Sequence, residues 1–253
     1  MENAMVIMNH WNTLDWTMVS ILAARRLRLA NQRFMAKNEI FWYPILGMGM
    51  YFHGCFFLKR NWAQDKAVLD ESLKDLSSST IPFWFVFYPE GTRKTPAKLA
   101  QSQSYGKKNN LPILSHVLLP RTLGFVTMAQ SLRHHMDCLY DCTLGFADGS
   151  SPSVYDMMAG NYTNKDLYLH VRRFGMDKLP TENKDLADWL VGRYVEKDRQ
   201  LAYLQRNGKF MEDDLEDPLP FSRLAYNWIA CLQNNPHSPP QKPSRGSALK
   251  KTQ

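Results

Sequence analysis

Cysteine is scarce in this chain of 253 residues, which contains four: Cys55, Cys138, Cys142 and Cys231. Small secreted domains that depend on disulfides carry a much higher density of cysteine, so we expect a reducing, cytosol-facing environment. The first residues also lack the basic segment and the cleavage site of a signal peptide. We therefore expect neither a disulfide framework nor a signal peptide.

A concentrated basic surface is missing as well. The formal net charge is +7, but Lys242, Arg245, Lys250 and Lys251 lie within residues 236–253, a stretch without an acid. The rest of the chain is only mildly basic and has no recognisable nucleic-acid-binding motif, so we expect no nucleic-acid partner. A mildly basic body suits a membrane surface or a phosphorylated ligand.

No apolar stretch is both long and uninterrupted. Residues 40–58 carry no formal charge, but Pro44, Gly47, Gly49 and Gly54 each weaken a helix interior. A transmembrane helix needs about 20 predominantly apolar residues in a row. We expect a buried core segment, or a hydrophobic surface that dips into a membrane, in preference to a spanning helix.

Short apolar runs alternate with helical patterns along the chain. Strands are expected at residues 5–8, 81–88, 139–146 and 167–174, and between 111 and 119. Helices are expected from residue 13 through the arginine-rich stretch ending at 33, and at 61–76, 95–110, 125–132 and 185–205. This alternation predicts an α/β layered fold with a largely parallel central sheet flanked by helices. We expect one domain over residues 1–210, an acidic segment and short apolar helix over 211–233, and a disordered basic tail over 234–253.

His10 and Asp15 are the first candidates for chemistry. His10 follows the apolar run that ends at Met8, and Asp15 falls where a helix is expected to begin, with Asn12 or Thr13 as its cap. Across such a turn the carboxylate reaches Nδ1–H and leaves Nε2 free to accept a proton. A capping aspartate beside a partly buried histidine is the simpler alternative. The chain has no Gly-x-Ser-x-Gly motif, so the pair suits direct transfer with a substrate hydroxyl as nucleophile.

Two basic segments downstream suit a phosphorylated ligand. Arg60 follows the apolar residues 40–58, and Arg93 follows the run that ends at Tyr88. Guanidinium groups at such positions bind phosphate in a bidentate manner. Backbone N–H groups around Gly91 add to such a site if the turn opens a helix. Ordinary solvated surface charges are the alternative.

In their order and spacing, four segments resemble the glycerolipid (lysophospholipid) acyltransferases. Asn9-His10 with Asp15 is similar to the family's Asn-His-x4-Asp motif, and the segment Gly54–Arg60 is similar to Gly-x-x-Phe-hydrophobic-x-Arg. The segment Tyr88–Arg93 is similar to Phe-Pro-Glu-Gly-Thr-Arg, and Leu118-Leu119-Pro120 to the hydrophobic-Pro motif. The longer segment Leu119–Phe125 looks like the eukaryotic branch that holds lysophosphatidic acid and lysocardiolipin-type enzymes.

The resemblance implies an acyl-CoA-dependent transfer to the sn-2 hydroxyl of a lysophospholipid, in phospholipid biosynthesis at a membrane such as the endoplasmic reticulum. Lysophosphatidic acid is the expected acceptor, with lysophosphatidylinositol or lysocardiolipin as alternatives. The catalytic residues would be His10 and Asp15. The acceptor phosphate would be bound by Arg60, Glu90, Gly91, Thr92 and Arg93. Pro120 would lie on the acyl-donor side, and the reaction requires neither a cofactor nor a metal.

Three other interpretations differ in class. His134, His135, Cys138 and Cys142 have a spacing that a zinc site also uses, although a strand is expected there. A lipid-binding or membrane scaffold without turnover would keep the fold and the apolar surface. A hydrolase would use His10 and Asp15 to activate water. Release of the thiol from acyl-CoA, with and without acceptor, distinguishes transfer from hydrolysis and from a silent scaffold.

Overall fold

The computed structural model describes residues 2–12, 15–25, 29–59, 82–149 and 167–211, together with Glu71, Lys74 and Leu76. The chain divides into two units, Met1–Leu219 and Pro220–Gln253, and the second lies outside the described residues. Most of the helix expected at 61–76 lies outside them too, as does the chain beyond residue 211. The expected division at residues 210 and 233 stays a prediction.

Six strands form one sheet in the order β3-β2-β4-β1-β5-β6. Every neighbouring pair from β3 to β5 is parallel, and β6 runs antiparallel to β5. The predicted α/β fold with a largely parallel sheet is therefore confirmed. The strands are β1 Ala4–Met8, β2 Gln32–Lys37, β3 Phe56–Leu58, β4 Trp84–Phe87, β5 Cys138–Phe146 and β6 Leu167–Gly175. The helices are α1 Asp15–Arg25, α2 Leu46–Phe52, α4 Pro96–Lys108, α5 Thr122–Leu132 and α7 Asn183–Asn207, with 3₁₀ turns at Leu29–Asn31, Asn38–Trp42 and Met176–Lys178.

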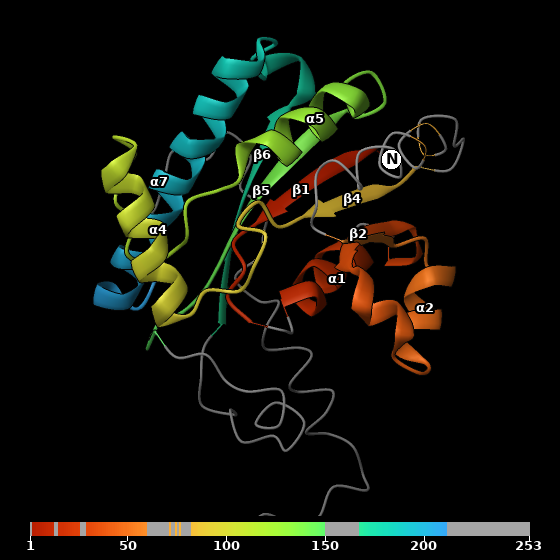
Figure 1. Ribbon diagram of the computed structural model, residues 1–253, viewed down its shortest axis with the longest axis horizontal. Helices are drawn as coiled ribbons and strands as arrows, with labels where there is room; N and C mark the ends of the chain where they lie inside the picture. Colours follow the sequence, from red (N-terminus) through yellow and green to blue (C-terminus); the bar gives the residue numbers. More distant parts are fainter. Residues whose placement is uncertain are drawn as a thin grey trace, which may run out of the picture. The chain divides into compact units, whose positions relative to one another are not determined.

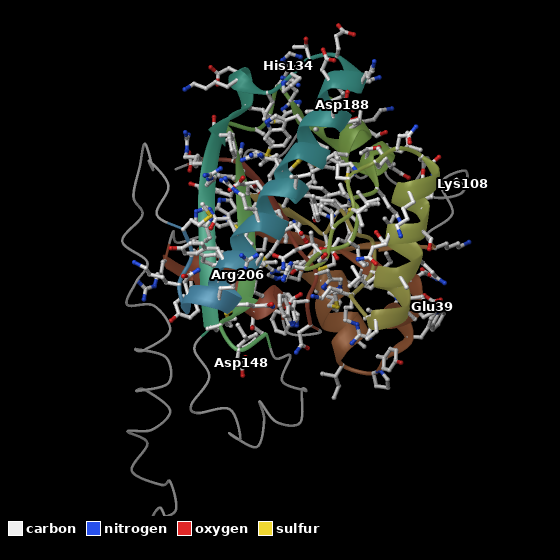
Figure 2. The ribbon with its side chains drawn as sticks, turned by 90° about the vertical axis from the view of Figure 1, so that its left-hand side faces the viewer. Glu39, Lys108, His134, Asp148, Asp188 and Arg206 are labelled. Carbon is white, nitrogen blue, oxygen red and sulfur yellow. The ribbon has the colours of Figure 1, made fainter. Side chains whose placement is uncertain are left out.

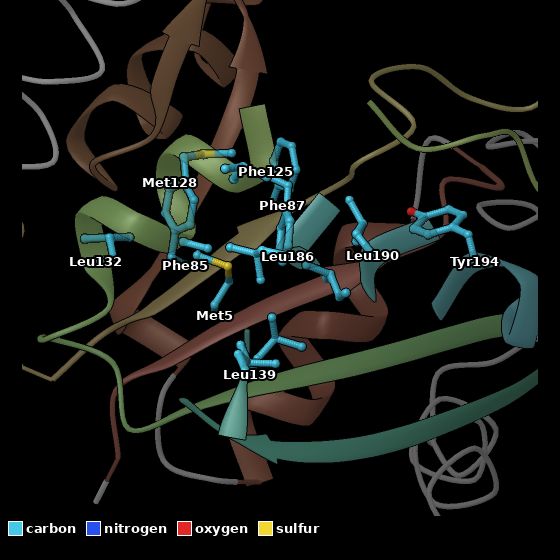
Figure 3. Packing of buried hydrophobic residues seen from close by; sticks show 14 of the residues in the cluster. Met5, Phe85, Phe87, Phe125, Met128, Leu132, Leu139, Leu186, Leu190 and Tyr194 are labelled. Carbon is cyan, nitrogen blue, oxygen red and sulfur yellow. The ribbon is translucent and has the colours of Figure 1, made fainter. Parts of the chain in front are cut away.

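The centre of the sheet is fully buried. All five residues of β1 and all four of β4 are buried, which explains why both appear in the sequence as continuous apolar runs. In the view of Figure 1, α5 lies above and α1 below strands β1 and β4. Figure 3 shows Met5 and Phe85 of the strands packed with side chains of α5 and α7, such as Phe125.

Helix α7 packs against the sheet through one narrow stripe of buried side chains. Its buried apolar positions include 186, 190, 194, 201 and 204, whose intervals of three, four or seven residues place them on one face. Figure 2 shows the helix with Asp188 and Arg206 pointing away from the sheet, and both are exposed. Gly208 ends the helix in the left-handed conformation that favours glycine, at φ 72°.

The helix expected from residue 13 to 33 was predicted too long. Helix α1 ends at Arg25, and residues 32–37 form strand β2, which the sequence did not predict. Strand β2 is inserted between β3 and β4 through backbone pairing on both sides. Only Gln32 of this strand is fully buried, so its segment QRFMAK needs few apolar residues. The segment therefore shows neither a continuous apolar run nor an alternation.

Residues 40–58 run from the 3₁₀ turn Asn38–Trp42 through α2 into β3. Of the two alternatives expected for this stretch, the buried core segment is wrong for most of it, since seven large apolar side chains are exposed: Phe41, Trp42, Tyr43, Ile45, Met48, Tyr51 and Phe52. The other alternative, a hydrophobic surface that dips into a membrane, stays a prediction. These seven residues are called the aromatic patch below. Within the described ranges, no helix combines the length and apolarity needed to cross a bilayer.

The two glycines of α2 differ in the space that surrounds them. A Cβ atom at Gly47 would lie 2.0 Å from the carbonyl oxygen of Phe41, whereas one at Gly49 would meet no atom within 4 Å. Gly47 therefore permits the close contact between α2 and the preceding 3₁₀ turn.

We predict that Gly47→Ala forces this turn away from α2 and lowers the local free energy of opening by about 1–3 kcal/mol. Gly49→Ala is the matched control, and it should stabilise the helix by about 0.5–1 kcal/mol. Hydrogen exchange of peptides from residues 38–58 measures both effects. Equal exchange in the two variants would contradict the close contact.

Candidate active site

The candidate site lies where β1 and β4 end. These strands are parallel neighbours, and Ile7 is paired with Phe87. His10 follows β1 by two residues and Glu90 follows β4 by three, so both emerge at the same edge of the sheet. Ligands of open α/β sheets bind at the carboxyl ends of the strands.

His10 and Asp15 form a hydrogen-bonded pair. Nδ1 of His10 lies 3.0 Å from Oδ2 of Asp15, and the same oxygen accepts the backbone N–H of Asn12 at 2.8 Å. Asp15 is buried at the start of α1, while the His10 side chain is about a quarter exposed. Nε2 of His10 makes no hydrogen bond with any described residue, so it is the nitrogen left to accept a proton.

Burial raises the pKa of the Asp15 carboxyl above its usual range, while the hydrogen bonds from His10 and Asn12 act in the opposite direction. The aromatic ring of Tyr88 lies against the imidazole, with 4.6 Å between ring centroids. The imidazole is thus held by a carboxylate at one nitrogen and by a ring on one face, which leaves it little freedom to rotate.

Asn9 attaches the loop that carries His10 to β5. Its side-chain amide donates to the carbonyl oxygen of Leu144 at 2.9 Å and accepts the Leu144 N–H at 2.8 Å. This pair of bonds continues the sheet one residue beyond the end of β1. The backbone at residue 10 is therefore fixed on the side of β5.

Glu90 fixes the same loop from the other side. One oxygen of its buried carboxyl accepts the His10 N–H at 3.0 Å, and the other accepts the Leu118 N–H at 3.3 Å. Burial raises the pKa of this carboxyl to about 8, against the effect of the two hydrogen bonds. Glu90 was expected to bind the acceptor, but the structure directs both oxygens at backbone N–H groups.

The stretch expected to enter a strand near residue 119 is a loop instead, because side chains take its N–H groups. Oδ1 of Asp198 on α7 accepts the N–H groups of residues 115, 116 and 117, at 2.8, 2.5 and 3.3 Å. Oγ of Ser102 on α4 accepts the Leu119 N–H at 2.9 Å. Pro120, expected on the acyl-donor side, therefore stands at the end of a loop held by three elements.

The turn after Glu90 places the remaining predicted residues. Gly91 has φ 66°, and its N–H donates to the Tyr88 carbonyl at 2.9 Å. Helix α4 begins only at Pro96, so this N–H is not part of a helix start open to an anion. The hydroxyl of Thr92 accepts a hydrogen bond from Lys98, and Arg93 is exposed.

Arg60 lies outside the described residues, so its place relative to His10 stays a prediction. The structure brings together His10, Asp15, Glu90 and the turn that carries Gly91, Thr92 and Arg93. The structure also brings Lys94 to this place, a residue that the sequence did not predict. The Lys94 N–H donates to the His10 carbonyl at 3.0 Å, and Nζ of Lys94 lies 4.3 Å from the Trp11 ring centroid.

Asp198 and Ser102 were missed as well, and no local pattern could have found them. Asp198 acts on a loop about 80 residues earlier in the chain, and neither residue belongs to a recognisable motif. The zinc interpretation finds no support in the described part of the chain. His134 and His135 are exposed, Cys138 and Cys142 are buried in β5, and no three ligand side chains converge there.

Residues 1–144 match the family described as Acyltransferase, and residues 157–231 match one described as Acyltransferase C-terminus. The chain is 36% identical, over 229 residues, to a Bos taurus protein named 1-acyl-sn-glycerol-3-phosphate acyltransferase delta, covering 90% of this chain and 60% of that protein. It is 34% identical over 233 residues to a Pongo abelii protein named 1-acyl-sn-glycerol-3-phosphate acyltransferase gamma, covering 91% and 61%. An Arabidopsis thaliana protein named probable 1-acyl-sn-glycerol-3-phosphate acyltransferase 5 is 29% identical over 231 residues, covering 91% and 61%. The chain thus spans about three fifths of the length of these curated relatives.

The raised pKa of Glu90 predicts how stability depends on pH. The folded protein keeps a proton on this carboxyl up to about pH 8, whereas the unfolded chain releases it near the usual pKa of 4.5. The contribution of Glu90 to the free energy of unfolding is therefore at its maximum below pH 4.5, and it is lost as the pH rises towards 8.

We predict that Glu90→Gln destabilises the fold by about 1–3 kcal/mol at pH 5.5, because one backbone N–H loses its acceptor. The difference from the wild type should shrink towards pH 8.5, where the native carboxyl must be buried with a charge. Urea unfolding at both pH values measures this, with the exposed Glu182→Gln as control. A difference that stays constant or grows with pH would show that the pKa of Glu90 is not raised.

Proposed function

Because the chain belongs to the acyltransferase family, we propose that it transfers an acyl group from acyl-CoA to the sn-2 hydroxyl of a lysophospholipid. The proposed acceptor is lysophosphatidic acid and the product is phosphatidic acid, as the names of the relatives suggest. The observation that carries the proposal is the 3.0 Å contact between His10 Nδ1 and Asp15 Oδ2 at the carboxyl end of β1. Acceptors with a lysophosphatidylinositol or lysocardiolipin head group remain alternatives to be tested.

In the proposed reaction, Nε2 of His10 removes the proton of the acceptor hydroxyl as its oxygen attacks the thioester carbonyl. The tetrahedral intermediate then expels the CoA thiolate, and the imidazolium returns the proton to the sulfur. Asp15 stabilises the imidazolium between the two steps and holds the tautomer that leaves Nε2 without a proton. The C–O bond of the new ester forms and the C–S bond of the thioester breaks, so no redox partner is needed.

Substrate positioning is the second part of the proposal. Arg60, Thr92 and Arg93 bind the acceptor phosphate, and Pro120 lies on the acyl-donor side. Glu90 acts as a positioning residue, since it holds the His10 backbone and the loop at Leu118 in one geometry. Fixing the two reacting groups together supplies much of the rate enhancement in such reactions.

The test is the release of thiol from acyl-CoA with and without lysophosphatidic acid. Release that depends on the acceptor, together with formation of phosphatidic acid, supports transfer. Release that is independent of the acceptor would identify a hydrolase, and no release would identify a silent lipid-binding scaffold. A panel with lysophosphatidylinositol and monolysocardiolipin then ranks the acceptor head groups.

We predict that His10→Ala lowers kcat by about 10²–10⁴-fold, the usual contribution of a general base. Asp15→Asn should also lower kcat strongly, because the neutral amide no longer stabilises the imidazolium. Both variants should keep the acceptor KM within a few fold, and His135→Ala, an exposed histidine, is the control. Undiminished turnover of folded His10→Ala protein would rule out the base assignment.

The aromatic patch supports a membrane location for the domain, with the catalytic face towards a reducing compartment and the endoplasmic reticulum as the proposed organelle. Trp42, Ile45 and Phe52 are 76%, 87% and 78% exposed, which is unusual for such large apolar side chains. Tryptophan and tyrosine favour the boundary between lipid headgroups and acyl chains. A lipid surface would cover the patch, and it would also supply the acceptor.

We predict that Trp42→Ala combined with Phe52→Ala weakens binding to vesicles of phosphatidylcholine and phosphatidylserine by about tenfold or more, because two large apolar groups leave the lipid. The matched control is Tyr105→Ala with Leu123→Ala, which removes two exposed apolar side chains outside the patch. Liposome flotation measures the bound fraction. A wild-type chain that stays entirely in the soluble fraction, or equal loss in both double variants, would contradict this role of the patch.

A further inference from the structure

The backbone of Arg121 is fixed against the candidate active site. Arg121 follows Pro120 and directly precedes α5, and its backbone N–H donates to the Pro89 carbonyl at 2.8 Å. This bond ties residue 121 to the turn that carries Gly91 and Arg93. The carboxyl of Glu90 fixes this turn to the backbone of His10.

The side chain of Arg121 crosses the turn directly over Gly91. A Cβ atom added at Gly91 would lie 3.2 Å from Cδ, 3.3 Å from Nε and 3.6 Å from Cζ of Arg121. Any larger residue at position 91 would occupy the place of the guanidinium stem, in addition to the strain that φ 66° imposes on it. Gly91 thus leaves the space in which the Arg121 side chain lies.

Cationic side chains outnumber acidic ones around this turn. Arg93 and Lys94 belong to the turn, Lys98 donates to Thr92, and Arg121 lies across Gly91. Two acids are near: the charge of Asp198 acts on Lys94, whereas burial raises the pKa of Glu90 to about 8 and keeps that carboxyl neutral below this pH. The side chain of Arg121 is exposed and makes no hydrogen bond or ion pair with any residue in the described ranges. Such a cluster of cations attracts an anion.

We infer that the guanidinium of Arg121 binds the phosphate of the acceptor, next to Arg93, and so favours acceptors with a phosphomonoester head. This inference rests on the proposed function. The acceptor's sn-2 hydroxyl and its phosphate are carried by adjacent carbons, so a hydroxyl at His10 places the phosphate close by. The phosphates of acyl-CoA lie at the far end of the pantetheine arm, away from the thioester. Position 121 therefore fits the acceptor better than the donor.

The first test compares Arg121→Gln and Arg121→Lys with Arg206→Gln, an exposed arginine of α7 used as control. With a short-chain lysophosphatidic acid, Arg121→Gln should raise the acceptor KM by about 10–100-fold, the usual effect of losing hydrogen bonds to a charged group. Arg121→Lys should give a smaller rise, because it keeps the charge but loses the bidentate geometry. The acyl-CoA KM should stay within about twofold in all three variants.

An unchanged acceptor KM in folded Arg121→Gln protein would overturn the inference. A rise in the acyl-CoA KM instead would assign Arg121 to the phosphates of the donor and would overturn it too. A wild-type protein that releases no thiol in an acceptor-dependent manner fails the proposed function itself, which is a distinguishable result.

A second test needs no variant and holds even if Arg121→Gln fails to fold. Phenylglyoxal modifies exposed arginine side chains, and peptide mass spectrometry measures the extent at each position. Lysophosphatidic acid should protect Arg121 and leave Arg206 reactive, whereas free CoA should protect neither. Modification of Arg121 at the same rate with and without lysophosphatidic acid would overturn the inference.

Discussion

The buried carboxyl of Glu90 is the constraint on which the rest of the site depends. Its two oxygens hold the backbone of His10 and of Leu118, which belong to loops about 108 residues apart in the chain. Without these bonds, the buried N–H of Leu118 and the partly buried N–H of His10 would lose their partners, at a cost of up to about 1–3 kcal/mol each. Burial places the pKa of this carboxyl at about 8, so the same group that joins the loops makes their geometry sensitive to alkaline pH.

The other fixed points act on the same two loops from different elements. Asn9 attaches the first loop to β5, and Asp198 attaches the second to α7. Asp15 then orients the imidazole, and its burial strengthens the interaction of its charge with an imidazolium, because little water screens it. The site is thus built from backbone positions that are held on several sides. The side chains left exposed beside it, Arg93 and Arg121, are cations suited to a phosphate.

The sequence predicted the parts of the fold and the site that depend on neighbouring residues. The runs that became β1 and β4 are buried on both faces, and His10 reaches Asp15 across a single turn. Strand β2 was missed because backbone pairing, rather than apolar side chains, holds it in the sheet. The loop before Pro120 was mistaken for a strand because its apolar residues are buried while side chains such as Asp198 take its N–H groups. Such partners lie far away in the sequence, so no local pattern could reveal them.

The central claim is that Asp15 holds His10 in the tautomer with a proton on Nδ1 and none on Nε2. Nitrogen-15 NMR of the histidine ring, in wild-type protein at neutral pH, measures this directly. We expect a protonated Nδ1 and a bare Nε2 for His10, with the preference for this tautomer reduced in Asp15→Asn. A proton on Nε2 in the wild-type protein, with Nδ1 bare, would contradict the assignment of His10 as the general base.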